Sequence, residues 1–155
     1  MKILILHPHF SSQYKYILLA LCQNPENKIV FLCRNDQARI DFPNLEIVKY
    51  AVEEEEDSEL IELTHLKKNY LEGREVRKTL VELKKRKGFV PHIILCHPSW
   101  GQALYLKDVY PDVPLISYAE HYPQNFGRVI FHDSLESLCH DSMQVMKMKA
   151  STYMH

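Results

Sequence analysis

The stretch KILIL, residues 2–6, is an almost continuous apolar run, and the polar turn HPHFSS at 7–12 follows it directly. Runs of this kind indicate a strand that is buried on both faces, as at the centre of a parallel sheet. Beyond the turn, apolar residues recur at helical spacing from Tyr14 to Cys22. A strand, a turn and a helix in this order make the repeating unit of α/β proteins, so the opening of the chain predicts a parallel sheet.

The same alternation continues along the chain. We expect further strands at 28–33, 45–50, 91–96 and 114–118, and helices at 60–87, 102–109 and 142–155. Gly73 could divide the helical segment at 60–87 into two shorter helices. The sequence therefore predicts an α/β fold: a three-layer, Rossmann-like parallel sheet of order 3-2-1-4-5 over residues 1–125. Residues 126–155 are expected to form a C-terminal extension.

The composition is that of an ordinary globular protein. The chain has 155 residues, of which 46% are hydrophobic and 25% charged, so we expect one domain with a single core. Its 19 basic residues nearly balance 20 acidic ones, and the net charge of -1 offers no basic field for nucleic acid. No apolar run approaches the roughly 18 residues of a spanning helix, so any membrane contact is expected to be peripheral.

Cysteine and glycine usage exclude further classes of protein. The four cysteines stand at long, unequal spacings without a CxxC pair, which argues against a zinc knuckle or a redox dithiol. With no signal peptide visible, they favour a reducing, cytoplasmic location. The four glycines cannot assemble a GxGxxG fingerprint or a GxxxxGK[ST] phosphate loop. We therefore expect no bound cofactor.

Three turns at the carboxyl ends of the expected strands carry side chains suited to chemistry. They lie at 7–13, 97–102 and 119–122, after the first, fourth and fifth strands. In an open parallel sheet, ligands bind at this edge, where the strand order reverses. The turns hold four of the nine histidines, the only tryptophan and one carboxylate, Glu120. Such a set suits general acid and base catalysis on a hydroxyl group.

Each of these residues also has a structural interpretation. His97 could simply cap its strand, and Trp100 could fill the core instead of offering a stacking platform to a sugar ring. His7 and His9 could bind a metal, but no HExxH or CxxC partner accompanies them. Glu120 has no basic partner nearby in sequence, so it is solvated, paired at a distance, or functional.

Several stretches resemble one known family. The segment HPSWGQALYLKDVYP at 97–111, with PLISYAE at 114–120, is similar to the HPGWGE, LFLKD and YFE signature of a subgroup of glycosyltransferase family 4. LHPHFSSQY at 6–14 resembles that family's HQNFPGQF segment, and GFVPHII at 88–94 resembles its GFRPDVI lead-in. The resemblance covers about residues 1–125.

The chain also departs from the family pattern. Ser99 stands where the pattern has glycine, and Gln102 stands where it has an acid. FHDS at 131–134 matches the usual FDPE only weakly. His121 stands where this subgroup usually has a bulky residue, although other members of the family have a histidine there.

The resemblance implies the N-terminal, Rossmann-like half of a two-domain GT-B fold, the half that lines the acceptor side of the cleft. We expect a second half, absent from this sequence, to hold the nucleotide sugar, so the chain alone should be inactive or nearly so. By the same analogy the turn at 7–13 lies near the donor phosphates, and Glu120 or His121 is the acceptor-activating base. The residues expected to contact substrate are His7, His9, Phe10, Gln13, His97, Ser99, Trp100, Gly101 and Tyr122.

The sequence therefore predicts the acceptor-side domain of a glycosyltransferase that transfers a sugar to a hydroxyl of a sugar or lipid-linked acceptor. Its partners would be that acceptor, a nucleotide-sugar donor, and a C-terminal domain or partner chain. Two other functions stay open. One is a non-catalytic Rossmann-like subunit that binds a separate catalytic half. The other is a small metal-dependent hydrolase that uses His7, His9, His97 and His121.

Overall fold

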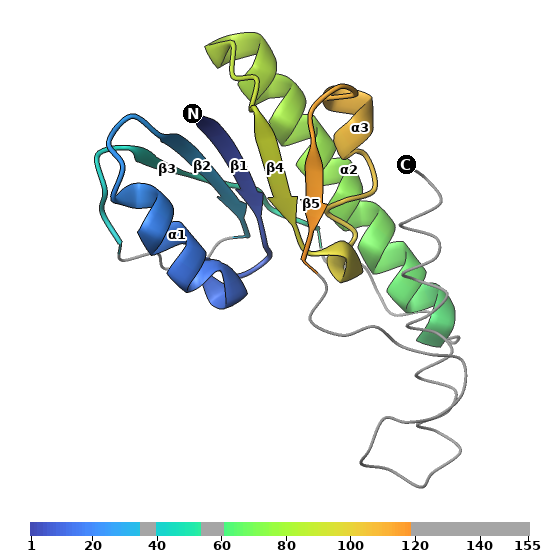
Figure 1. Cartoon of the computed structure of the whole chain (residues 1–155). Helices are drawn as coiled ribbons and strands as arrows, with labels where there is room; N and C mark the ends of the chain where they lie inside the picture. The colour runs from blue at the N-terminus through green and yellow to red at the C-terminus, as the bar shows by residue number, and fades with distance from the viewer. Residues whose placement is uncertain (35–39, 54–60, 119–155) are drawn as a thin grey trace, which may run out of the picture.

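The structure is a computed structural model that describes residues 1–34, 40–53 and 61–118 (Figure 1). The strands are β1 (Lys2–Leu6), β2 (Lys28–Cys33), β3 (Leu45–Lys49), β4 (Ile93–Cys96) and β5 (Leu115–Ser117). The helices are α1 (Lys15–Cys22), α2 (Ile61–Lys87) and α3 (Leu106–Val109), with short 3-10 helices η1 (Ser12–Tyr14) and η2 (Pro98–Trp100). The expected extension at 126–155, with its helix at 142–155, lies outside the described residues.

The strands form one parallel sheet in the order β3-β2-β1-β4-β5, which confirms the predicted order. β1 lies at its centre, where Leu4 is opposite Val30 of β2 on one side and Ile94 of β4 on the other. From Ile3 to Leu6 every residue is fully buried. The apolar run at 2–6 is therefore the central strand, because only a strand covered on both faces needs side chains of this kind throughout.

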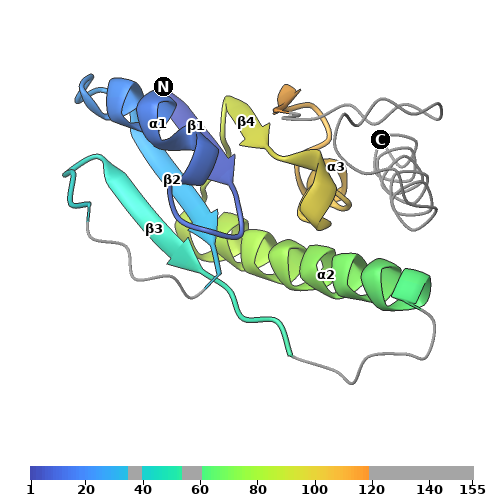
Figure 2. The same ribbon diagram turned by 90° about the horizontal axis from the view of Figure 1, so that it is seen from below.

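Helices cover both faces of the sheet (Figures 1 and 2). Because alternate residues of a strand point to opposite faces, Ile3 and Ile5 of β1 pack with Leu18 on the side of α1. Leu4 packs instead with Leu80 of α2, and the core on that side also includes residues of α3. The molecule thus has the three predicted layers, with α1 on one face and the long helix α2 on the other.

The helix α2 runs unbroken from Ile61 to Lys87, so Gly73 does not divide it. Gly73 instead marks the place where the turn after β4 packs against the helix. A Cβ atom on Gly73 would lie only 2.7 Å from the carbonyl oxygen of Gly101. An isolated glycine costs a helix about 1 kcal/mol relative to alanine. Here its missing side chain lets two backbones approach each other.

The helix expected at 102–109 is wrong in its first half. The Leu104 amide donates to the Gly101 carbonyl at 3.1 Å, and the Leu106 amide donates to the Ala103 carbonyl at 3.3 Å. These bonds close separate turns, and α3 begins only at Leu106. The cause is Gly101, whose φ of +78° is incompatible with a right-handed helix and directs the chain along α2.

The cysteines that the structure describes are buried, as the sequence predicts. Cys22, Cys33 and Cys96 are buried free thiols, as their apolar surroundings predict, and Cys139 lies outside the described residues. Burial raises the pKa of the Cys96 thiol, which therefore stays protonated at neutral pH. Within residues 1–34, 40–53 and 61–118, no helix has the length and apolar character needed to cross a membrane.

Tyr110, directly after α3, is expected to make this core less stable at alkaline pH. Its ring is buried, its hydroxyl donates to the Phe89 carbonyl at 3.0 Å, and burial raises the pKa of the phenol to about 12. An unfolded tyrosine titrates near pH 10, so this contribution to stability is complete below pH 10 and decreases as the pH rises toward 12. We expect the free energy of unfolding of the wild type to decrease by up to about 1.4 kcal/mol per pH unit more than that of Tyr110→Phe.

Urea unfolding of the two proteins at pH 9, 10, 11 and 12 measures this difference. Tyr110→Phe also removes one hydrogen bond, which costs about 1 kcal/mol at every pH. The comparison therefore uses the pH dependence and not the absolute stability. Parallel pH profiles for the wild type and the variant would show that Tyr110 is not held protonated by the fold.

Candidate functional site

Two of the three predicted turns meet at the carboxyl edge of the sheet. Leu6 and Cys96 are partners in the register of β1 and β4, so the residues that follow them are neighbours. The rings of His7 and His97 lie 6.1 Å apart, centroid to centroid, and nearly perpendicular, with an interplanar angle of 89°. The strand order reverses between β1 and β4, and this is where ligands bind in open parallel sheets.

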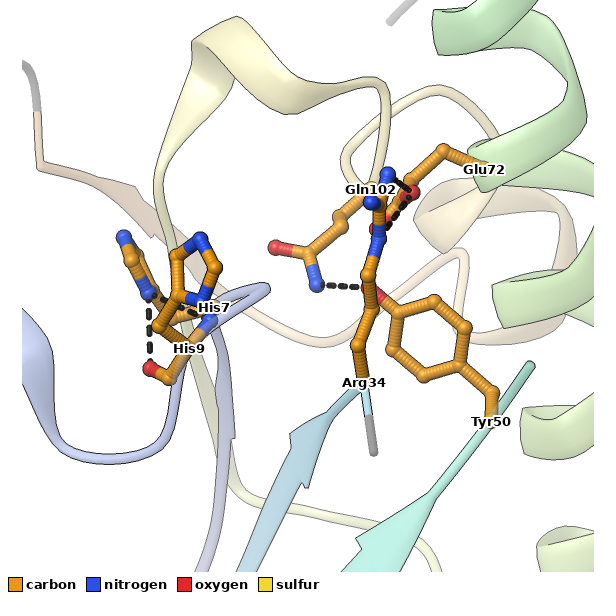
Figure 3. A network of polar contacts seen from close by, with 6 residues as sticks. All are labelled: His7, His9, Arg34, Tyr50, Glu72 and Gln102. Atoms are coloured by element: carbon orange, nitrogen blue, oxygen red, sulfur yellow. Dashed lines mark hydrogen bonds and ion pairs between the residues drawn. The ribbon is translucent and has the colours of Figure 1, made fainter. Parts of the chain in front are cut away.

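The two histidines continue on both sides into a row of rings, which we call the ring row: His9, His7, His97 and Trp100. Successive ring centroids are 6.0, 6.1 and 6.2 Å apart. The His9 amide donates to Nδ1 of His7 at 3.0 Å and fixes the turn (Figure 3). His7 and His97 are buried, whereas His9 is exposed and Trp100 is 47% exposed. A ligand on this edge can therefore contact the two ends of the ring row directly.

Phe10 and Tyr14, which follow His9 in the sequence, pack in the core on the α1 side. Phe10 packs on Phe31 of β2, with ring centroids 4.9 Å apart, in the core on the α1 side. Tyr14, one residue after the half-buried Gln13, is fully buried, with its ring 6.2 Å from His7 and 5.8 Å from Tyr118. Phe10 thus holds the turn after β1 against the core. Tyr118, directly after β5, lies close to the same turn through its contact with Tyr14.

The turn after β4 is fixed by its contact with α2. Gly101 is buried, and a Cβ atom on it would lie 2.1 Å from the carbonyl oxygen of Asn69. Gly101 therefore allows the backbone between Trp100 and Gln102 to lie directly against α2. Ser99 lies in η2, next to Trp100. The candidate bases Glu120 and His121, and the candidate wall Tyr122, lie outside the described residues.

Sequence reasoning missed a polar network beside the ring row (Figure 3). It joins Arg34 after β2, Tyr50 after β3, Glu72 on α2 and Gln102 after β4. Arg34 donates from Nε to Glu72 Oε2 at 2.8 Å and also from Nη2, and the Tyr50 hydroxyl donates to Glu72 Oε1. Nε2 of Gln102 in turn donates to the Tyr50 oxygen. The ends of β2 and β3 thus contact the carboxylate on α2 directly, and the turn after β4 joins the network through Tyr50.

The electrostatics of this network follow from its burial. Glu72 is fully buried, and a buried carboxylate is tolerated only when charged or polar partners satisfy it. Hydrogen bonding to Glu72 raises the pKa of Arg34, and burial, followed by the nearby Glu72 charge, raises the pKa of Tyr50. Both groups therefore keep their protons at neutral pH and act as donors. One signal was visible in the sequence: Glu72 lies on the apolar stripe of Val76, Leu80 and Leu83, at helical spacing.

With this geometry in place, comparison with known families identifies the chain. Its sequence matches the glycosyl transferase family 4 group over residues 25–155. The chain belongs to glycosyl transferase family 4. No curated protein matches it. The match includes β2 to β5 and the turn at 97–102, so the resemblance in the sequence is confirmed at the level of the family.

Membership in family 4 indicates a class of substrates. Proteins of this family take a sugar donor and an acceptor as substrates. The alternative hypothesis, a metal-dependent hydrolase, requires four histidines as ligands. One of them, His121, lies outside the described residues. Among the residues that the structure does describe, no three His, Cys, Asp or Glu side chains are grouped so that they could hold a metal ion.

Proposed function

We propose that this chain forms the acceptor side of a nucleotide-sugar-dependent glycosyltransferase. The acceptor hydroxyl oxygen would form a bond to the anomeric carbon of the donor. The bond from that carbon to the phosphate oxygen would break, and the nucleoside diphosphate would leave. The observation that carries the proposal is the ring row at the reversal of strand order, in a chain that belongs to family 4.

Trp100 supports the acceptor role of this edge. Its indole is about half exposed, although it ends the short helix η2 that follows β4 and its ring lies 6.2 Å from that of the buried His97. An exposed indole offers a flat apolar face and one N–H donor, which suits the apolar face and the hydroxyls of a sugar ring. We assign Trp100 as a wall of the acceptor site and His9, exposed at the other end of the ring row, as a polar contact.

The proton of the attacking hydroxyl requires a base, and Glu120 and His121 are the candidates. They follow β5, and the Tyr118 amide donates to the Cys96 carbonyl at 3.0 Å, which keeps this stretch in register with β4 up to residue 118. Tyr122 is proposed as a second wall. In the complete enzyme, the nucleotide sugar would be held by a second domain or a partner chain, so little transfer is expected from this chain alone.

Binding of sugars to Trp100 tests the proposal. Methyl α-glucoside, methyl α-mannoside and methyl α-galactoside are titrated into the chain, and the fluorescence of its only tryptophan is recorded. At least one glycoside should change the emission. Trp100→Ala should weaken its binding, measured by NMR, by about 2- to 13-fold, because stacking of this kind contributes about 0.5–1.5 kcal/mol. Tyr16→Ala is the matched control, since Tyr16 is an exposed aromatic residue on α1.

Two results would contradict the proposal. The acceptor site is wrong if none of the glycosides perturbs the NMR signals of residues 7–9 and 97–102. The need for a second half is wrong if the 155-residue chain alone transfers radiolabelled sugar from a nucleotide sugar to an acceptor at an ordinary enzymatic rate.

A further inference from the structure

Arg34 occupies a distinctive place beside the ring row. It is the first residue after β2, and its amide donates to the Pro8 carbonyl at 2.9 Å, which ties it to the turn that carries His7 and His9. The side chain of Arg34 is 48% exposed, whereas that of its ion-pair partner, Glu72, is only 1% exposed. The guanidinium thus stands between a buried carboxylate and the surface of the same edge.

The hydrogen bonds of Arg34 use one side of the guanidinium. Nε and Nη2 both donate to the same oxygen of Glu72. A guanidinium carries five N–H donors in a planar fork, so further donors remain on a side chain that solvent reaches. The geometry of these donors is fixed in advance, because Glu72 is in turn held by the Tyr50 hydroxyl.

We propose that the solvent-facing side of Arg34 binds an oxyanion of the substrate, a phosphate or a carboxylate, next to the acceptor site. This inference rests on the proposed function and narrows it: the sugar recognised at this edge carries a negative charge. Two parallel N–H donors match two oxygens of such a group, which is the recognition for which arginine is better suited than lysine.

The arrangement favours a substrate role over a purely structural ion pair. A buried carboxylate could be satisfied by neutral donors such as Tyr50, whereas a charged partner that remains half exposed keeps its capacity for a second anion. Because Glu72 offsets much of the positive charge, binding must depend on directed hydrogen bonds and on a fixed guanidinium. Fixing it beforehand lowers the entropy cost of binding.

NMR of the full chain labelled with ¹⁵N tests this site. The Nε–H signal of Arg34 is assigned by its loss in Arg34→Lys and followed during titration with glucose 6-phosphate, glucuronate, UDP-glucose and neutral methyl glucoside. We expect the anionic sugars to shift this signal and to bind at least about tenfold more tightly than methyl glucoside, as one charge-assisted hydrogen bond provides. Arg34→Lys should reduce that advantage to below about threefold, because lysine lacks the planar pair of donors.

The arms of the experiment separate the possible sources of the anion. A response to glucose 6-phosphate or glucuronate supports an anionic acceptor, whereas a response to UDP-glucose alone would overturn the acceptor assignment. Arg74→Lys is the matched control, because Arg74 is also half exposed and paired with a glutamate, Glu75, but lies on α2. It should retain the full preference for the anionic sugars.

Failure of this inference and failure of the proposed function give different results. If sugars perturb the Trp100 indole but no anion shifts the Arg34 signal, or if Arg34→Lys keeps the preference, the oxyanion site is wrong and the acceptor site stands. If anions shift Arg34 while no sugar perturbs Trp100, the oxyanion site stands and the proposed acceptor function is wrong. The direct observation of the wild-type Nε–H signal does not depend on the folding of any variant.

Discussion

Replacement of Gly101 by alanine is expected to lower the free energy of unfolding by about 3 kcal/mol. Two costs add to give this value. A left-handed φ, here +78°, costs a residue with a side chain about 1–2 kcal/mol. The new Cβ would lie 2.1 Å from the carbonyl oxygen of Asn69, and overpacking of a rigid contact typically costs about 1–3 kcal/mol. The clash is with helix backbone, so no side-chain rotation can relieve it.

Gly88→Ala is the control for the backbone term. Gly88 also has a positive φ, +59°, but a Cβ atom placed on it would meet nothing within 4 Å. Its cost should therefore be the conformational one alone, about 1 kcal/mol. Urea unfolding of both variants, with m-values compared to confirm a common transition, gives the two values. Equal destabilisation by the two substitutions would show that the close approach of the turn to α2 does not exist.

The Gly101 variant should also alter the site. The turn that contains Gly101 connects Trp100 of the ring row to Gln102 of the polar network, so a displaced turn moves both. In whatever fraction of Gly101→Ala remains folded, the emission of Trp100 should differ from that of the wild type. Gly88→Ala should leave it unchanged, because Gly88 follows the far end of α2.

The central strands and their order could be predicted because they depend on local patterns. The run at 2–6 is apolar throughout, and alternation of strands with helices restricts the connections of a parallel sheet to few topologies. The same logic placed His7 and His97 together, since both directly follow strands that become neighbours. Adjacency of this kind requires only the strand order.

The sequence left a break at Gly73 open and placed the start of the helix at 102–109 wrongly, and in both places tertiary contacts determine the conformation. Gly73 has the propensity of a helix breaker, yet its helix is stabilised by the packing of Val76, Leu80 and Leu83 in the core. The glycine itself lets the backbone of the turn at Gly101 approach that of the helix. The residues after Gly101 have helical spacing, but the turn follows α2 instead of forming its own helix. Local sequence carries no information about a neighbour that is far away along the chain.

The polar network escaped prediction for a related reason. Its members are single residues from four elements, and each of them, read alone, is ordinary: an arginine and a tyrosine after strands, a glutamine in a turn. Only Glu72, an acid on an apolar helical stripe, departs from the pattern. A buried carboxylate must find donors, so such a residue indicates that partners exist, although the sequence cannot show which residues they are.

The second large effect is expected at this carboxylate. Glu72→Gln should lower the free energy of unfolding by about 2–3 kcal/mol, less than the 3–5 kcal/mol typical of a fully buried pair because Arg34 is partly exposed. Glu75→Gln is the control on the same helix. Glu75 accepts from Lys78 at 2.8 Å and from Arg74 at 3.0 Å, but both of these partners are exposed to solvent, so its loss should cost no more than about 1 kcal/mol.

Glu72→Gln is costly because two neighbouring side chains donate hydrogen bonds to this carboxylate. Arg34 and Tyr50 both donate to the carboxylate, and Gln102 donates to Tyr50. An amide has one oxygen and one NH₂ group, so it can accept from only one of these two sides. If its oxygen faces Arg34, its NH₂ faces the Tyr50 oxygen, and the hydroxyl proton of Tyr50 is left without its acceptor. A buried donor left without a partner costs about 1–3 kcal/mol.

Tyr50→Phe separates the contribution of the tyrosine from that of the charge. It removes the donor to Glu72 Oε1 and the acceptor for Gln102 but keeps the ion pair with Arg34, so we expect a smaller loss of about 1–2 kcal/mol. Because the two substitutions disrupt one network, the double variant should lose less than the sum of the single losses. Additive losses in urea unfolding, or equal effects of Glu72→Gln and Glu75→Gln, would contradict a carboxylate that holds Arg34 and Tyr50 together.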